Sequence, residues 1–73
     1  MEAAKEAILE IVDSAGGVML YADMMAQLSP AYHRYVPMAL RQLRSENLLL
    51  KQNRVVEGDV RFEVFRPESR PGL

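Results

Sequence analysis

The most informative part of this chain is the stretch Val36-Pro-Met-Ala-Leu-Arg-Gln-Leu-Arg-Ser-Glu-Asn-Leu-Leu-Leu50. Val36, Leu40 and Leu43 recur at helical spacing and predict an amphipathic helix from about residue 35 to residue 47. Asparagine is the residue that best replaces glycine in the left-handed conformation that ends many helices. We therefore expect Asn47 to end this helix and the leucines after it to begin a strand.

Charge is unevenly distributed along the chain. Residues 31–56 carry five cations against Glu46 alone, a local balance of +4. Residues 1–30 carry Lys5 against five acids, a balance of −4, and residues 57–73 add −1 to give the net charge of −1. A local positive field attracts phosphate even when the net charge is low. The basic segment therefore indicates either a surface for nucleic acid or an ordinary solvated face.

Length and composition restrict the class of protein. The chain is long enough for one domain, assigned to residues 1–66, and the proline- and glycine-containing residues 67–73 are predicted to be a flexible tail. No apolar run approaches the ~20 residues of a membrane span, and the acidic N-terminus lacks the features of a signal peptide. The absence of cysteine fits a reducing compartment. We therefore expect a cytoplasmic protein that does not associate with a membrane.

The remaining sequence predicts a small α+β domain with three helices, a short strand and a C-terminal hairpin. The further elements are expected over residues 2–15 (helix), 18–20 (edge strand), 21–28 (short helix), 48–56 and 60–65 (strands). Gly16-Gly17 should end the first helix, and Ser29-Pro30 should interrupt the chain so that residues 31–34 are irregular. The turn Glu57-Gly58-Asp59 should close the hairpin.

Apolar side chains predict how these elements pack. The three helices should meet around Ile8, Ile11, Leu40 and Leu43. In the last strand, residues alternate between the two faces of the sheet, so Val60, Phe62 and Val64 should share one face.

This order of elements, with the residues that fill it, resembles the winged helix-turn-helix family. Tyr21-Ala-Asp-Met-Met-Ala-Gln-Leu28 looks like the second helix of that family, and residues 36–49 look like its recognition helix and the exit into the wing. Gly58-Asp-Val-Arg-Phe-Glu-Val-Phe65 is similar to the return strand of the wing. The resemblance covers residues 2 to 66. It implies a small stand-alone bacterial or phage-type regulator of transcription that binds double-stranded DNA, as a dimer or cooperatively.

The resemblance places the helix over residues 35–47 in the major groove. Arg41 and Gln42 are residue types that hydrogen-bond guanine and adenine edges, and Met38 and Ser45 share their side of the helix. Met38 suits a thymine methyl group or a protein partner. Arg44 suits either DNA or a nearby acid.

Residues outside this helix are expected at the DNA backbone. Arg34 and Tyr35 precede the helix, where such proteins often meet phosphates. Arg54 and Arg61 belong to the hairpin, whose acidic tip Glu57-Gly58-Asp59 would repel phosphate. These two arginines should therefore act from the sides of the hairpin.

Two functional classes remain open from the sequence. The first is the sequence-specific DNA-binding regulator. The second is a winged-helix adaptor that binds another protein, because the sequence is acidic overall and Pro37 occupies a position where the family commonly has a small polar or basic residue. Met38, Leu9 and the acidic first helix would be its contact surfaces.

The sequence has no phosphate loop, nucleophile–base pair or cofactor fingerprint. Its single histidine, His33, has no cysteine beside it, so no enzyme, cofactor or metal site is expected.

Overall fold

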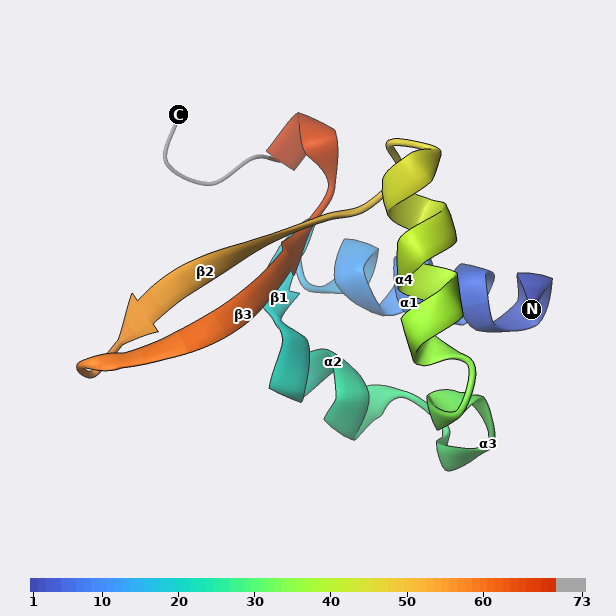
Figure 1. Ribbon diagram of the computed structural model, residues 1–73, viewed down its shortest axis with the longest axis horizontal. Helices are drawn as coiled ribbons and strands as arrows, with labels where there is room; N and C mark the ends of the chain where they lie inside the picture. The colour runs from blue at the N-terminus through green and yellow to red at the C-terminus, as the bar shows by residue number, and fades with distance from the viewer. Residues whose placement is uncertain (70–73) are drawn as a thin grey trace.

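A computed structural model of the chain describes residues 1–69. The elements in chain order are α1 (Glu2–Ser14), β1 (Val18–Leu20), α2 (Tyr21–Gln27), α3 (Pro30–His33), α4 (Val36–Ser45), β2 (Leu50–Val56), β3 (Asp59–Phe65) and the 3₁₀ turn η1 (Pro67–Ser69). Figure 1 shows the helices at one end of the molecule, with β2 and β3 extending away from them as a hairpin. None of these helices is long and apolar enough to cross a membrane. The described part of the chain has an α+β fold, as predicted.

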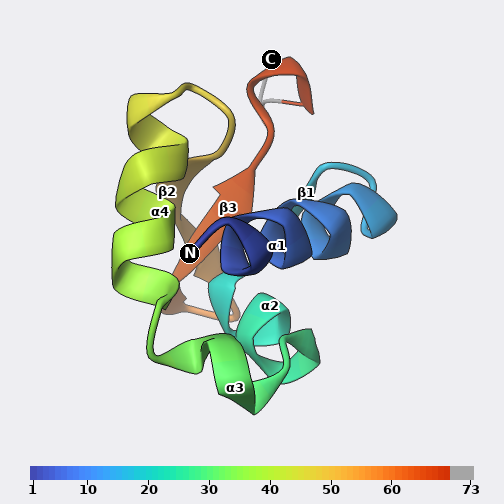
Figure 2. The same ribbon diagram turned by 90° about the vertical axis from the view of Figure 1, so that its right-hand side faces the viewer.

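The strands within residues 1–69 form one antiparallel sheet with the order β1-β3-β2. Val18 of β1 and Leu50 of β2 both lie opposite Phe65, on either side of the central strand. β1 pairs only with residues 63–65 of β3, so the rest of the hairpin has two strands and projects past the helices. Figure 2 shows α1 in front of the sheet, with α4 to one side and α2 and α3 below.

One apolar core joins the helices to the sheet. Ile8 of α1 and Leu43 of α4 are fully buried with Val64 of β3. Ile8 and Leu43 therefore lie where the helical pattern predicted. Ile11 and Leu40, predicted beside them, are only partly buried and pack against the edge of this core.

The helix ends follow from residues that accept a left-handed backbone. Asn47 has φ 56, its N–H donates to the Arg44 carbonyl at 3.0 Å, and the Leu48 N–H donates to the Leu43 carbonyl at 2.9 Å. These two bonds satisfy carbonyls that the end of α4 leaves without a helical partner. Gly16, at φ 86, ends α1 with the same pattern. The prediction that Asn47 is a left-handed cap is confirmed.

The prediction of an irregular segment over residues 31–34 is wrong for residues 31–33, and of these four residues only Arg34 lies in a turn. Pro30–His33 forms α3, so residues 1–69 contain four α-helices instead of the three predicted. Pro30 stands in the first turn of α3, where its fixed φ suits the helix and its missing N–H removes no helical bond. The same residue type that interrupts one helix begins the next.

The His33 side chain links α3 to the end of α2 by hydrogen bonds. Its Nε2 atom lies 3.0 Å from the Leu28 carbonyl oxygen and 3.1 Å from that of Met25. Because both partners are acceptors, Nε2 carries the proton and donates to the last turn of α2. The only histidine of the sequence thus has a structural role.

The hairpin closes where the sequence predicted. Glu57 and Gly58 have φ values of 52 and 83, between the paired residues Val56 and Asp59. A turn of two residues with positive φ matches the right-handed twist of the strands that it joins. β2 begins at Leu50 and β3 at Asp59, so the strand boundaries shift by one or two residues from those predicted.

The two faces of β3 are buried to different extents. Val60, Phe62 and Val64 share one face, as predicted, but only Val64 is buried, and Phe62 is 53% exposed. The reason is that residues 59–62 extend beyond the helices. On the opposite face, Glu63 and Phe65 are both buried.

The chain after β3 returns to the loop that follows α1. The Arg66 N–H donates to the Gly17 carbonyl at 2.7 Å, and any side chain at Gly17 would collide with Ser69. Residues 67–69 of the predicted tail form η1 at this place, and residues 70–73 of that tail lie outside the described residues.

Candidate functional site

The solvent-facing side of α4 has two edges. The edge toward the hairpin carries Pro37, Arg41 and Arg44, and the other edge carries Met38, Gln42 and Ser45. Met38 is 60% exposed, whereas Gln42 is half-buried. Both arginines of α4 are exposed and lie on the edge that faces β2 and β3. The positive charge of α4 is therefore directed toward the hairpin.

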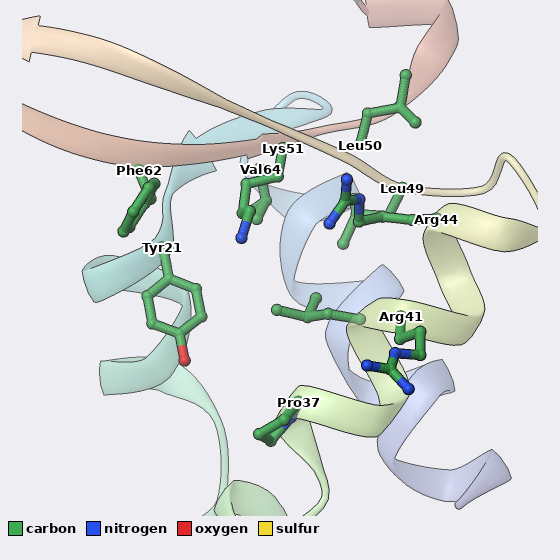
Figure 3. Close-up of a pocket in the computed structure, with 10 residues that line it drawn as sticks. Tyr21, Pro37, Arg41, Arg44, Leu49, Leu50, Lys51, Phe62 and Val64 are labelled. Carbon is green, nitrogen blue, oxygen red and sulfur yellow. The ribbon is translucent and has the colours of Figure 1, made fainter.

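A groove of about 450 Å³ separates α4 and the start of α2 from the hairpin. It is lined by Tyr21, Pro37, Leu40, Arg41, Arg44, Leu49, Leu50, Lys51, Phe62 and Val64. Three of these residues are cations and none is an acid, so the groove attracts anions. Figure 3 shows the rings of Tyr21 and Phe62 on one side of the groove and Arg41 and Arg44 on the other.

Lys51 and Phe62 meet on the face of the hairpin that is turned toward α4. The Lys51 Nζ lies 5.1 Å from the centroid of the Phe62 ring, within the range of a cation–π contact. The sequence predicts only that Lys51 lies in the strand over residues 48–56, and it predicts no functional role for Phe62. Their proximity depends on the pairing of Lys51 with Val64. The turn position fixes this register, so the sequence did contain the signal.

Arg34 and Tyr35 occupy the turn between α3 and α4. Both are exposed, and the Arg34 guanidinium lies 5.4 Å from the centroid of the Tyr35 ring. Neither residue lines the groove. They form a second cationic and aromatic surface, at the N-terminal end of α4.

Arg54 is engaged with a buried acid. Its Nη1 lies 2.6 Å from Oε2 of Glu63, which is only 1% exposed, and Gln52 donates to the other carboxylate oxygen at 3.0 Å. Arg61 lies directly opposite Arg54 on the same face of the hairpin. Lys51 and Arg54 are three residues apart in one strand, so they point to opposite faces. The structure thus separates Arg54 and Arg61 from the groove.

The tip of the hairpin combines acids with exposed valines. Glu57 and Asp59 are exposed, and Val55 and Val60, which lie directly opposite each other, are 70% and 68% exposed. Exposed apolar pairs on a projecting element are a feature of surfaces that bind other molecules. The sequence does not predict this exposed pair.

The structure shows the surroundings of Arg44 and Leu9, two residues whose roles the sequence left open. Arg44 forms no ion pair with an acid in residues 1–69 and lines the groove instead. Leu9, a predicted contact residue for a protein partner, is partly buried and packs against the core. Arg44 is thus directed to the groove, whereas Leu9 contributes mainly to the fold.

Comparison of the chain with protein-family models, curated proteins and solved structures finds no match.

Proposed function

We propose that the chain is a sequence-specific regulator that binds double-stranded DNA, with α4 in the major groove and the β2–β3 hairpin as the wing of a winged helix-turn-helix fold. The observation that carries the proposal is the joint position of Arg41, Arg44 and Lys51. They come from two elements and line one groove that contains no acid. The order of helices and strands is compatible with that fold, with α3 as an additional short helix before the recognition helix.

The dimensions and charge of α4 support this role. A helix with its side chains is ~10–12 Å across and the major groove is ~12 Å wide. Glu46, the acid that follows α4, is paired with Lys5 of α1 at 2.8 Å. Its charge is therefore compensated on the protein and repels phosphate less.

Different residues on the solvent-facing side of α4 would contact different parts of the DNA. Arg41 is exposed and suits a guanine edge, where its planar fork donates two hydrogen bonds. Met38, Gln42 and Ser45 form the neighbouring edge, which would face adjacent bases. Arg34, beside Tyr35, would contact the DNA backbone at the N-terminal end of the helix.

The two faces and the tip of the hairpin would contribute unequally to this interface. Lys51 faces α4 and would hold a phosphate of the same duplex. Arg54 and Arg61 point to the other face, so a duplex on α4 would reach them only by bending around the edge strand β2. The acidic residues Glu57 and Asp59 oppose contact at the tip.

A single module of this size gives limited specificity. One DNA-binding module buries roughly 600–1,000 Å² of protein surface, which supports the expectation of a dimer or of cooperative binding along DNA. Two half-sites read by two copies would supply the remaining discrimination.

Salt dependence tests the proposal. In fluorescence anisotropy with labelled duplexes, affinity should fall linearly on a log–log plot as salt rises, with a slope set by the phosphate contacts. Arg34→Ala should weaken binding to all sequences and reduce that slope by roughly one unit. Glu10→Gln on α1 also changes the net charge by one and serves as the control, with an unchanged slope. The proposal fails if the wild-type chain binds no duplex in a salt-sensitive manner at low ionic strength.

A protein-binding adaptor is the second candidate, favoured by the exposure of Met38 and of the pair Val55 and Val60. Apolar contacts of this kind depend little on salt. A partner bound through Val55 and Val60 would be lost in the variant Val60→Asp, while binding of duplex DNA through α4 would remain.

A further inference from the structure

We infer that the groove between α4 and the β2–β3 hairpin binds one unpaired nucleotide, with its base against Phe62 and Tyr21 and its phosphate held by Arg44 and Lys51. The inference rests on the groove itself and goes beyond the proposed recognition of duplex DNA. It shares Arg44 and Lys51 with the proposed duplex interface but not Arg41, to which we assign the reading of a base edge in the duplex.

The groove has the size and lining of a small-ligand site. Its volume of about 450 Å³ lies within the ~300–1,000 Å³ typical of pockets for small molecules. Leu40 and Val64 are among its apolar lining residues, and its polar lining side chains are the three cations and Tyr21. This lining accepts a ligand that is flat and apolar in one part and anionic in another.

The aromatic side of the groove supplies a stacking surface. Phe62 is 53% exposed on the hairpin, Tyr21 at the start of α2 is partly buried against the core, and Figure 3 shows both rings beside the groove. Aromatic side chains that remain exposed beside cations are typical stacking platforms for nucleic-acid bases. A paired base inside a duplex has both faces covered by its neighbours. The ligand must therefore present an unpaired base.

The cationic side is placed to hold the phosphate of the same nucleotide. The Lys51 Nζ lies over one face of the Phe62 ring, 5.1 Å from its centroid, which leaves the other face for the base and puts a positive charge next to the stacking ring. Arg44 faces this pair from α4 and forms no ion pair within residues 1–69. Guanidinium and ammonium groups are the usual ligands of phosphate in proteins. No acid lines the groove to oppose the phosphate.

The nucleotide has two conceivable sources with the same chemistry, an unpaired residue of single-stranded DNA or a free mononucleotide. The test measures the binding of the full chain to three labelled probes, namely a blunt duplex, the same duplex with a single-stranded overhang, and the overhang strand alone. The overhang duplex should bind about tenfold more tightly than the blunt duplex, since one stacked base contributes on the order of a five- to hundredfold change in affinity. Unlabelled mononucleotide, with inorganic phosphate as its control, is added as competitor. Competition by the mononucleotide at micromolar concentration identifies the free nucleotide as the ligand, and its absence identifies the single strand.

Variants in the groove separate stacking from charge. Phe62→Leu keeps an apolar side chain but removes the ring, so it should abolish the preference for the overhang and leave blunt-duplex binding unchanged. Phe62→Tyr should restore the preference. Val60→Ala, on the same strand and face but outside this groove, is the matched control. Lys51→Gln and Arg44→Gln should reduce the preference for the overhang duplex over the blunt duplex. Arg34→Gln removes a cation outside the groove, so it should weaken both probes alike and leave the preference unchanged. Melting curves should be recorded to check that each variant is folded.

The outcomes distinguish this inference from the proposed function. Equal affinity of the wild-type chain for blunt and overhang duplexes, or an overhang preference that survives Phe62→Leu, overturns the nucleotide site and leaves duplex recognition intact. Binding of single strands that depends on Phe62, without any binding of blunt duplex, supports the nucleotide site and overturns the duplex proposal.

Discussion

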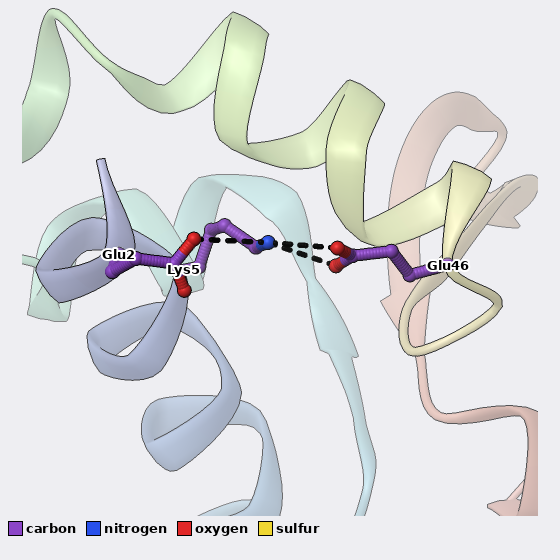
Figure 4. A network of polar contacts seen from close by, with 3 residues as sticks. All are labelled: Glu2, Lys5 and Glu46. Carbon is purple, nitrogen blue, oxygen red and sulfur yellow. Dashed lines mark hydrogen bonds and ion pairs between the residues drawn. The ribbon is translucent and has the colours of Figure 1, made fainter.

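Lys5 of α1 and Glu46 at the end of α4, which are 41 residues apart, are joined by an ion pair with Nζ 2.8 Å from Oε1 (Figure 4). The same ammonium lies 3.5 Å from Glu2, one turn earlier in α1. Lys5 is buried although it carries a charge. The hydrogen bond to Glu46 raises the pKa of Lys5 above its ordinary value, with the charge of Glu2 acting in the same direction.

This raised pKa predicts how stability depends on pH. The contribution of the pair is fully present below the unfolded lysine pKa of 10.5 and is lost as pH rises through the higher folded pKa. Lys5→Met keeps much of the apolar stem but removes the charge. Its thermal midpoint should be below that of the wild type at neutral pH, and the gap should close above pH 10.5. A gap that stays constant with pH would show that Lys5 contributes through packing alone. Glu46→Gln should show the same pH-dependent difference in thermal midpoint from the wild type.

Arg54 should matter for stability as well as for any contact with DNA. Arg54→Ala leaves the buried carboxylate of Glu63 with Gln52 as its remaining hydrogen-bond partner, which should cost about 1–3 kcal/mol of unfolding free energy. Urea denaturation measures the loss. Arg61→Ala, directly across the strand pair and exposed, is the control and should change stability by less than about 0.5 kcal/mol. Equal effects of the two substitutions would contradict a specific role for the Arg54–Glu63 pair.

The two leucines of α4 should differ in importance. Leu43 is fully buried and Leu40 is partly exposed beside the groove. Leu43→Ala should therefore destabilise the protein by about 2–5 kcal/mol, with a smaller loss for Leu40→Ala. Thermal unfolding distinguishes the two. A larger loss for Leu40 would mean that α4 is rotated relative to the core.

The left-handed cap of α4 predicts opposite effects of two substitutions. At φ 56, Asn47→Gly should be neutral or mildly stabilising, because glycine adopts this conformation without steric strain. Asn47→Val should destabilise by roughly 1–2 kcal/mol, because a β-branched side chain is strained there. Denaturant midpoints measure both. Full stability of the valine variant would place the end of the helix elsewhere.

Arg41 offers the sharpest test of the proposed DNA contact. Arg41→Ala should lower discrimination at one base position by ~1–3 kcal/mol, with a smaller change in salt slope than Arg34→Ala. Arg41→Lys keeps the charge but loses the planar fork, so it should lose discrimination while retaining most of the affinity. Binding to a panel of duplexes that differ at single positions provides the measurement. A uniform loss over the panel would instead make Arg41 a phosphate contact.

Local features of the chain were predictable because they depend on neighbouring residues. Gly16 and Asn47 end their helices, and Glu57-Gly58 closes the hairpin, since few residue types accept a positive φ. The predicted order of strands and main helices agrees with the structure for the same reason. The short helix α3 was not predicted because a proline has two opposite meanings in a sequence. It ends a helix that precedes it, and it is also favoured in the first turn of a new helix, which is where Pro30 lies.

The candidate site was only partly predictable. Its basic segment and the exposed position of Arg41 on α4 follow from composition and helical periodicity. The groove does not follow from the sequence, because it depends on how α4 packs against the hairpin and on which face of the hairpin is turned toward α4. That packing brings Arg44 toward Lys51 and Phe62 and leaves Arg54 paired with Glu63 on the opposite face.

The sequence by itself determined to within two residues where each main helix and strand begins and ends, because backbone preference and apolar periodicity act over a few residues. Only the tertiary structure decided which charges are compensated. Lys5 and Glu46, and Arg54 and Glu63, meet through packing between separate elements. Pairing at a distance of 41 residues leaves no local pattern in a sequence, since it depends on the relative positions of whole helices.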